Sequence, residues 1–170
     1  MGKRNGTFSK IYIQLIFAVK YREALLFPEW ENELYSYISG IIQNKDQLSI
    51  AINGHYDHMH MLVAIRPACR LSDLVMEIKK ASTSFINAKR FVRKKFHWQE
   101  SYGAFSYSRW DVDMISAYIR NQKEHHRKKS FREKYLEVLE QFDIEFNSNH
   151  LFTWLDTKEQ PLSLTVAAGD

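Results

Sequence analysis

The sequence predicts an α+β fold: an antiparallel four-stranded sheet of the ferredoxin-like (RNA-recognition-motif-like) type, with packed helices and a further helix that carries a tyrosine. Segments rich in β-branched and aromatic residues alternate with segments of helical periodicity, in the order strand, helix, strand, strand, helix, strand, helix. The 170 residues are 45% hydrophobic, enough for one domain with a sizeable core. We expect a single domain over residues 1–155 and a C-terminal tail over 156–170.

The first half of the chain contains three predicted strands and one predicted helix. Residues 11–20 (IYIQLIFAVK) are apolar on both faces of a strand. Pro28 suits the first turn of a helix, whose apolar face is Leu34, Ile38, Ile41 and Ile42. Residues 48–52 and 58–65 form two further strands, for which Asn53-Gly54 is a suitable turn.

The second half contains one more predicted strand and three predicted helices. Apolar residues at helical spacing predict a long helix over residues 72–93. The aromatic residues of 98–108 predict the fourth strand, and Asp111 can cap a helix from about Val112 to Lys129. Residues 131–142 continue helically after a break.

The composition excludes several classes of protein. With Cys69 as the only cysteine, the chain forms no intrachain disulfide, which favours a reducing, cytoplasmic environment. No apolar run approaches the roughly 18 residues of a membrane helix, and the first ten residues lack the pattern of a signal peptide. We therefore expect a cytoplasmic protein that does not enter a membrane.

Positive charge is concentrated in two stretches of the chain, although the formal net charge is only +4. The first holds Lys79, Lys80, Lys89, Arg90, Arg93, Lys94 and Lys95, and the second holds Arg120, Lys123, Arg127, Lys128, Lys129 and Arg132. Such stretches fit a polyanion such as nucleic acid, but they also occur as solvated helix faces. Charge alone does not decide between these readings.

Two histidines occupy alternate positions of a predicted strand, in His58-Met59-His60. Alternate side chains share a face, about 7 Å apart along the strand, so both imidazoles can converge on one metal ion. The same pattern also occurs in histidines that hydrogen-bond at a surface. His55 lies just upstream, but a single strand cannot aim it with the other two.

A tyrosine and a glutamine lie four residues apart on a predicted helix, at Tyr118 and Gln122. Residues four apart stack on one helical face, so the phenol and the amide would project together, near His125 and His126. Packing explains a tyrosine in an apolar stripe equally well.

Together these motifs resemble the HUH-superfamily single-tyrosine transposases, which mobilise insertion sequences through single-stranded DNA. The similarity covers roughly residues 11–154, with Asp57 before the histidine pair and His125-His126 after Gln122. It extends to residues 17–22 (FAVKYR), to residues 98–108, and to Phe152 and Trp154.

The resemblance implies a function and a set of site residues. Tyr118 would be the nucleophile, and His58, His60 and Gln122 would hold Mg²⁺ or Mn²⁺; His125 and His126 are alternatives to Gln122. Relatives cleave and rejoin DNA at hairpin-bearing ends through a 5′-phosphotyrosine. They act as homodimers in which the tyrosine helix of one subunit completes the metal site of the other.

DNA contacts are expected from the basic helices, through Lys79, Lys80, Lys89, Arg90, Arg93, Arg120 and Arg127. Aromatic residues such as Trp98, Tyr102, Phe105 and Tyr107 are candidates for base stacking, although each also suits the core. Two other functions remain open: a domesticated nickase that processes repeats, and a non-enzymatic nucleic-acid-binding module. The pairing of Tyr118 with Gln122 favours the transposase, because binding alone requires neither.

Overall fold

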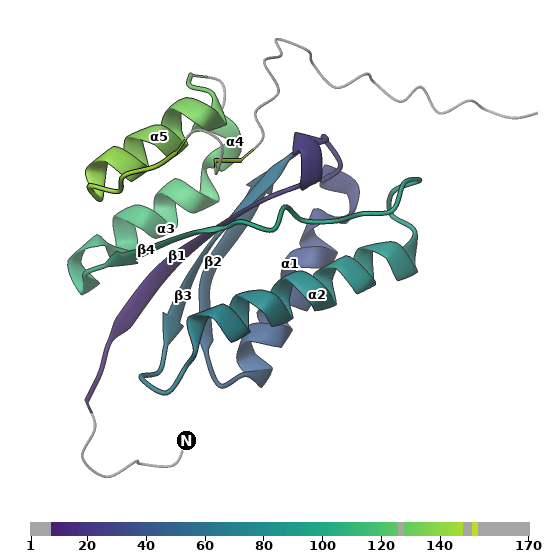
Figure 1. Ribbon diagram of the computed structural model, residues 1–170. Helices are drawn as coiled ribbons and strands as arrows, with labels where there is room; N and C mark the ends of the chain where they lie inside the picture. Colours follow the sequence, from purple (N-terminus) through teal and green to yellow (C-terminus); the bar gives the residue numbers. More distant parts are fainter. Residues whose placement is uncertain (1–7, 126–127, 148–150, 153–170) are drawn as a thin grey trace, which may run out of the picture.

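The computed structural model describes residues 8–125, 128–147 and 151–152 (Figure 1). Its strands are β1 (Ile11–Ala18), β2 (Leu48–His55), β3 (His58–Ile65) and β4 (Gly103–Tyr107). Its helices are α1 (Pro28–Asn44), α2 (Leu71–Lys89), α3 (Val112–Arg120), α4 (Gln122–His125) and α5 (Phe131–Gln141), with 3-10 turns η1 (Lys20–Arg22) and η2 (Arg109–Asp111). The proposed tail, 156–170, lies outside the described residues.

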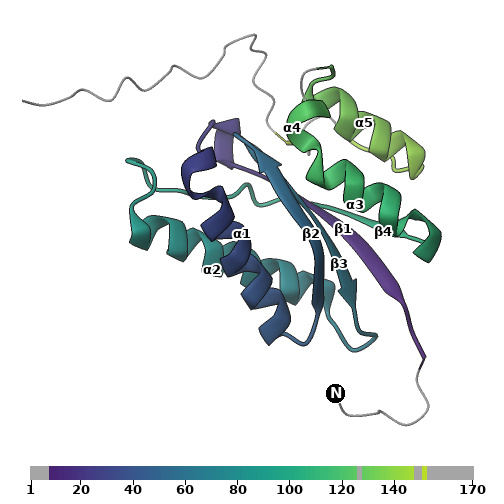
Figure 2. The same cartoon turned by 180° about the vertical axis from the view of Figure 1, so that it is seen from behind.

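The four strands form one antiparallel sheet in the order β2-β3-β1-β4. Helices α1 and α2 cover one face of this sheet, while α3, α4 and α5 lie on the other face (Figures 1 and 2). The ferredoxin-like α+β fold is therefore confirmed.

Strand β3 divides its side chains between the two layers. Met59, Met61 and Val63 are fully buried in the core beneath α1 and α2. The alternate residue Leu62 contributes to the cluster that seats α3 on the opposite face. His58 and His60 share that face, as the alternation of the strand predicts.

The predicted turn at Asn53-Gly54 is wrong, because both residues belong to β2. The strand continues to His55, and the turn falls at Tyr56 and Asp57. Gly54 pairs with Met59, and a Cβ at Gly54 would lie only 2.8 Å from the carbonyl oxygen of His58. Glycine is therefore required by close strand packing rather than by a turn.

Several other elements are shorter than the sequence predicts, among them β1, which ends at Ala18 rather than at residue 20. Helix α2 ends at Lys89 because Arg90 adopts a left-handed conformation with φ 55°. Trp98 forms only an isolated bridge with Val19, so β4 begins at Gly103. The helix expected from Val112 to Lys129 is interrupted at Asn121.

The expected helix cap at Asp111 is replaced by a cap at Ser108. The Ser108 hydroxyl donates to Asp111 Oδ2 at 2.7 Å, and the two residues form a capping box around η2. This turn leads directly into α3. In the described part of the chain, no helix has the length and apolar character needed to cross a bilayer.

Candidate active site

The two histidines of β3 and the tyrosine of α3 meet on the layer covered by α3 and α5. His58 and His60 are 0% and 3% exposed, and their ring centres are 5.2 Å apart with an interplanar angle of 79°. The Tyr118 ring lies 6.1 Å from the His60 ring. The structure thus brings the predicted nucleophile to the predicted metal ligands within one chain.

Gln122 joins this group from the first turn of α4. Its side chain is fully buried and lies close enough to the Tyr118 phenol to lower the pKa of that phenol. Although the helix is interrupted at Asn121 between them, Tyr118 and Gln122 remain paired. Asn53 of β2 fixes the end of α3, because its Nδ2 donates to the carbonyl oxygen of Arg120 at 2.7 Å.

The arrangement of His58, His60 and Gln122 fits a divalent metal. Imidazoles that bind one ion through nitrogens at roughly 2.1 Å, at angles between octahedral and tetrahedral, have ring centres roughly 4.6–5.3 Å apart. The 5.2 Å separation of His58 and His60 falls in that range. The described residues contain no group of three His, Cys, Asp or Glu side chains that could hold a metal. The family resemblance assigns the third donor to the Gln122 amide oxygen, which suits a hard ion.

Each histidine has a different hydrogen-bond partner behind it. His58 Nδ1 lies 2.6 Å from Asp57 Oδ1, and the other carboxylate oxygen of Asp57 pairs with the Arg22 guanidinium. His60 Nδ1 lies 3.1 Å from Gln14 Nε2, and the Tyr107 hydroxyl donates to Gln14 Oε1. Only His58 is therefore backed by a carboxylate.

The protonation states of His58 and Asp57 follow from this environment. Complete burial lowers the pKa of His58, against the raising effect of Asp57. Burial raises the pKa of Asp57, but the hydrogen bond and charge of His58 and the charge of Arg22 outweigh it and hold that pKa well below its usual range. An ionised Asp57 and a neutral His58 result, which leaves the Nε2 lone pair of His58 available to a metal.

The groups around Tyr118 shift the pKa of its phenol in opposite directions. Burial raises its pKa, the nearby Gln122 amide lowers it, and the charge of Glu137 raises it, so the net pKa lies above the usual value. The Lys134 ammonium lies 5.8 Å from the centre of the Tyr118 ring. Burial lowers the pKa of Lys134, and none of the described residues accepts a hydrogen bond from its Nζ.

Several residues around the site had not been predicted from the sequence. Phe131 of α5 stacks on His58 with ring centres 3.8 Å apart. His55 pairs with His58 across the β2–β3 hairpin, with ring centres 6.0 Å apart, and burial is the main cause that lowers its pKa to about 4. The partner strand therefore aims His55 at the pair, which a single strand could not. Asp57 was visible beside His58, and Arg22 ends the FAVKYR stretch of the family resemblance, but no local signal shows that the two pair or that Gln14 and Lys134 lie at the site.

The alternative third ligands are not placed by the structure. His125 belongs to α4, but nothing is described of its side chain, and His126 lies outside the described residues. Gln122 is the predicted third ligand that the structure describes, and its buried side chain lies beside Tyr118.

The basic residues proposed for DNA binding fall on both layers. Arg120 is exposed at the end of α3, on the layer of the site, while Lys80, Arg90 and Arg93 are exposed on or just after α2, on the opposite layer (Figure 2). Arg127 lies outside the described residues. The predicted surface is thus not one continuous face beside the histidines.

Two lysines of α2 have partners within the chain. Lys79 Nζ donates to the carbonyl oxygens of Gln99, Glu100 and Ser101 at 2.7–3.0 Å. Lys89 forms a 2.7 Å ion pair with Glu33. These contacts join α2 to the segment before β4 and to α1, respectively.

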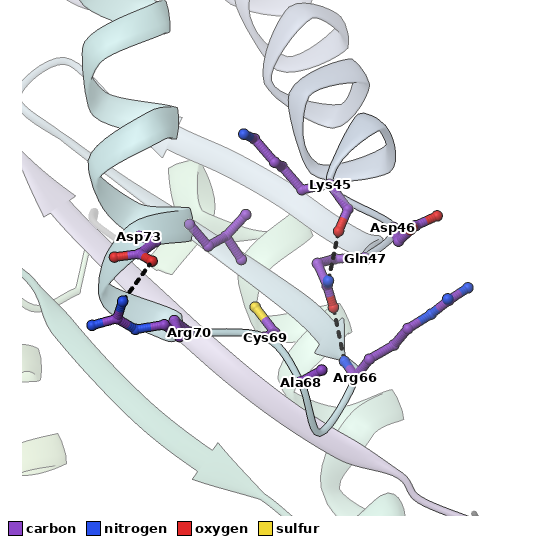
Figure 3. A pocket seen from close by; sticks show the side chains of 9 residues that line it. Lys45, Asp46, Gln47, Arg66, Ala68, Cys69, Arg70 and Asp73 are labelled. Carbon is purple, nitrogen blue, oxygen red and sulfur yellow. Dashed lines mark hydrogen bonds and ion pairs between the residues drawn. The ribbon is translucent and has the colours of Figure 1, made fainter.

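A separate hollow of about 350 Å³ lies where β3 leads into α2 (Figure 3). Its charged groups have mixed signs: Arg70 pairs with Asp73 at 3.5 Å, and the backbone N–H of Arg66 donates to Gln47. The hollow adjoins the end of β3 opposite to His58, so it is not part of the histidine and tyrosine site.

Comparisons with known proteins agree with this geometry. A family described as "Transposase IS200 like" matches residues 7–122, which include His58, His60, Tyr118 and Gln122. No curated protein compared with the chain matches it.

Two solved structures share the fold. A candidate transposase from Deinococcus radiodurans R1 is 27% identical, with a TM-score of 0.58 over 72% of this chain and 98% of that one. A REP-associated tyrosine transposase bound to a REP hairpin is 18% identical, with a TM-score of 0.55 over 74% of each chain, and this likeness concerns the fold alone. Because the family match spans more than half of the sequence, the chain belongs to the IS200-like transposase family.

Proposed function

We propose that this transposase cleaves and rejoins single-stranded DNA through a covalent bond to Tyr118. The observation that carries the proposal is the Tyr118 phenol, which lies beside the buried Gln122 amide and beside the buried His58 and His60. Packing alone would require neither the two buried histidines nor the Gln122 amide beside the Tyr118 phenol. We assign Mg²⁺ or Mn²⁺ to His58, His60 and Gln122 because the family resemblance implies these ions; the two imidazoles would also accept zinc, whereas the amide oxygen favours a harder ion.

The chemistry exchanges one phosphodiester for another. Tyr118 Oη bonds to phosphorus, the bond from phosphorus to O3′ breaks, and the departing O3′ takes up a proton. A 5′-phosphotyrosine and a free 3′-OH result. A bound divalent ion supplies charge withdrawal from a phosphate oxygen. Rejoining reverses the step with a 3′-OH as nucleophile, so no ATP is needed.

The proposed substrate is single-stranded DNA that carries hairpins at element ends. The solved relative bound to a REP hairpin supports this substrate class. Lys80, Arg90, Arg93 and Arg120 are exposed and remain candidates for phosphate contacts. Lys79 and Lys89 would first have to leave their partners within the chain. Such a substrate places the protein with the bacterial nucleoid, in the cytoplasm.

We further propose a homodimer in which α3 of one subunit completes the metal site of the other. An exchanged helix makes the same local contacts as one seated on its own chain. The apolar seat of α3, formed with Leu62 and Ala51, therefore suits either arrangement.

The central test is formation of a covalent adduct. The protein is incubated with labelled single-stranded hairpin DNA and Mn²⁺, denatured, and separated by electrophoresis. Tyr118→Phe should abolish the adduct and leave DNA binding largely intact, because only the nucleophilic oxygen is lost. Tyr37→Phe, an exposed tyrosine of α1, is the matched control and should react normally. An adduct that survives in Tyr118→Phe would refute the assignment.

A further inference from the structure

A buried ion pair lies directly behind the His58 imidazole. Asp57 occupies the turn between β2 and β3, where one of its carboxylate oxygens accepts a hydrogen bond from His58 Nδ1 and the other pairs with Arg22. The Arg22 side chain is only 7% exposed and that of Asp57 is 22% exposed. A buried guanidinium costs free energy unless it is paired, and Asp57 supplies the pairing.

The local backbone conformation places Arg22 beside Asp57. Tyr21 and Arg22 are both left-handed, with φ 59° and 55°. A left-handed conformation is unfavourable for such residues, so it persists only where surrounding contacts hold it. Two of those contacts are backbone hydrogen bonds to the hairpin turn, from Val19 N to Asp57 O and from Leu26 N to Tyr56 O, both 2.8 Å long.

A second chain of contacts links Arg22 to His58 through Phe131 of α5. Its guanidinium lies 4.6 Å from the centre of the Phe131 ring, and Phe131 in turn stacks on His58. The ring of His58 is thus held at its edge by Asp57 and across its face by Phe131, and Arg22 supports both.

We propose that Arg22 and Asp57 are positioning residues that fix His58 as a metal ligand. This inference rests on the proposed metal site. Asp57 accepts a hydrogen bond from the Nδ1–H group of His58, which selects the tautomer with Nε2 free to bind the ion. Arg22 prevents the carboxylate from rotating away. A carboxylate behind a ligating histidine also makes the imidazole a stronger donor.

His60 provides an internal contrast. Its Nδ1 meets the neutral amide of Gln14, which can present either its oxygen or its nitrogen by rotation. Asp57 therefore fixes one tautomer of His58, whereas Gln14 can hydrogen-bond either tautomer of His60. Loss of the Asp57 charge should weaken metal binding more than loss of the Gln14 amide.

The test measures Mn²⁺ binding to the DNA-free protein by isothermal titration calorimetry. Asp57→Asn and Arg22→Met should each weaken binding about 10- to 100-fold, the usual cost of removing a partner behind a metal ligand. Arg22→Lys should lie between these variants and the wild type, and Gln14→Leu should have a smaller effect than Asp57→Asn. Arg70→Met, which removes the exposed pair with Asp73, is the matched control and should bind as the wild type does.

A second readout separates positioning from general stability. Adduct formation by Asp57→Asn should need more Mn²⁺ for half-maximal yield and should recover most of its yield at saturating Mn²⁺. If Asp57→Asn does not fold, Asp57→Glu, which keeps the charge but shifts the carboxylate, takes its place and should show an intermediate loss. Folded variants that bind Mn²⁺ within twofold of the wild type would overturn the inference.

The outcomes for the wild type distinguish this inference from the proposed function. A wild-type protein that neither binds Mn²⁺ nor forms an adduct contradicts the proposed function itself. A wild-type protein that does both, beside an Asp57→Asn variant with unchanged affinity, contradicts only the role of Arg22 and Asp57.

Discussion

At the scale of single residues, the sequence shows the groups proposed to do the chemistry but not the contacts that hold them in place. His58 and His60 could be predicted because strand alternation fixes their common face, and Tyr118 and Gln122 because helical spacing does. Arg22 and Asp57 are 35 residues apart, and Gln14 and His60 are 46 apart. Such pairs depend on strand register and on the left-handed turn at Arg22, for which no local sequence pattern was available.

Lys134 provides a prediction about pH. Because the pKa of Tyr118 is raised, its phenolate is a minor species at neutral pH and grows about tenfold per pH unit. The rate of adduct formation should therefore rise with pH between about 6 and 9. The nearby Lys134 ammonium favours the phenolate, so Lys134→Met should slow the reaction about tenfold at pH 7, equivalent to about 1.4 kcal/mol.

Single-turnover rates at several pH values check this expectation. The deficit of Lys134→Met should shrink as the pH rises, because burial lowers the pKa of Lys134, which then loses its own charge. Lys128→Met, which removes an exposed lysine from the segment before α5, should follow the wild-type profile. Superimposable profiles for Lys134→Met and the wild type would exclude an electrostatic role for Lys134.

At the scale of elements, the order of strands and helices could be predicted, and their ends could not. Periodicity gives the type of each element, but contacts from distant segments decide where it stops. Asn53 illustrates this: its sequence neighbour Gly54 suggests a turn, yet Asn53 lies in β2 and binds the last carbonyl of α3. The same side chain that misled the turn prediction thus helps to place Tyr118 and Gln122.

Asn53→Ala should therefore affect chemistry more than metal binding. The substitution removes two side-chain hydrogen bonds, to the carbonyl oxygen of Arg120 and from the backbone N–H of Gly54. At about 1 kcal/mol each, their loss should lower the melting temperature of a chain of this size by about 4–8 °C. Adduct formation should fall further than this instability explains, because the end of α3 is no longer held, while the Mn²⁺ affinity falls less than in His58→Ala. Calorimetric melting and the adduct assay are measured side by side.

The matched control for this prediction is Asn87→Ala on the other layer. Asn87 also bridges two segments through its amide, which bonds the backbone N–H and carbonyl of Phe96. Its loss should lower stability and leave adduct formation by the folded protein unchanged. Equal effects of the two substitutions on the adduct would show that Asn53 contributes only stability.

At the scale of the whole molecule, the sheet separates the chemistry from much of the positive charge. The site lies with α3 and α5 on one layer, and Lys80, Arg90 and Arg93 lie with α2 on the other. The sequence showed the two basic stretches but not that the sheet lies between them, since this depends on which helix covers which face. DNA that reached all of these groups would have to contact both layers, or more than one subunit.

The proposed exchange of α3 between subunits can be tested by mixing two variants that are each inactive alone. Tyr118→Phe retains the histidines, and His58→Ala retains the tyrosine. If α3 acts on the partner, a heterodimer of the two has one site with both groups intact, and random pairing restores about a quarter of the wild-type sites. The subunits are mixed under conditions that allow exchange, and the adduct is measured with labelled hairpin DNA.

The control for this experiment mixes the Tyr118→Phe protein with a double variant that carries both Tyr118→Phe and His58→Ala. Because neither protein of this mixture has Tyr118, no adduct should form. Tyr118 and His60 lie side by side in a single chain of the structure, so a site that never exchanges would give no adduct in either mixture. That result, with the wild type active and subunit exchange demonstrated by differently tagged chains, would restrict catalysis to one chain. It would leave the chemistry of Tyr118 intact and remove the need for a shared site.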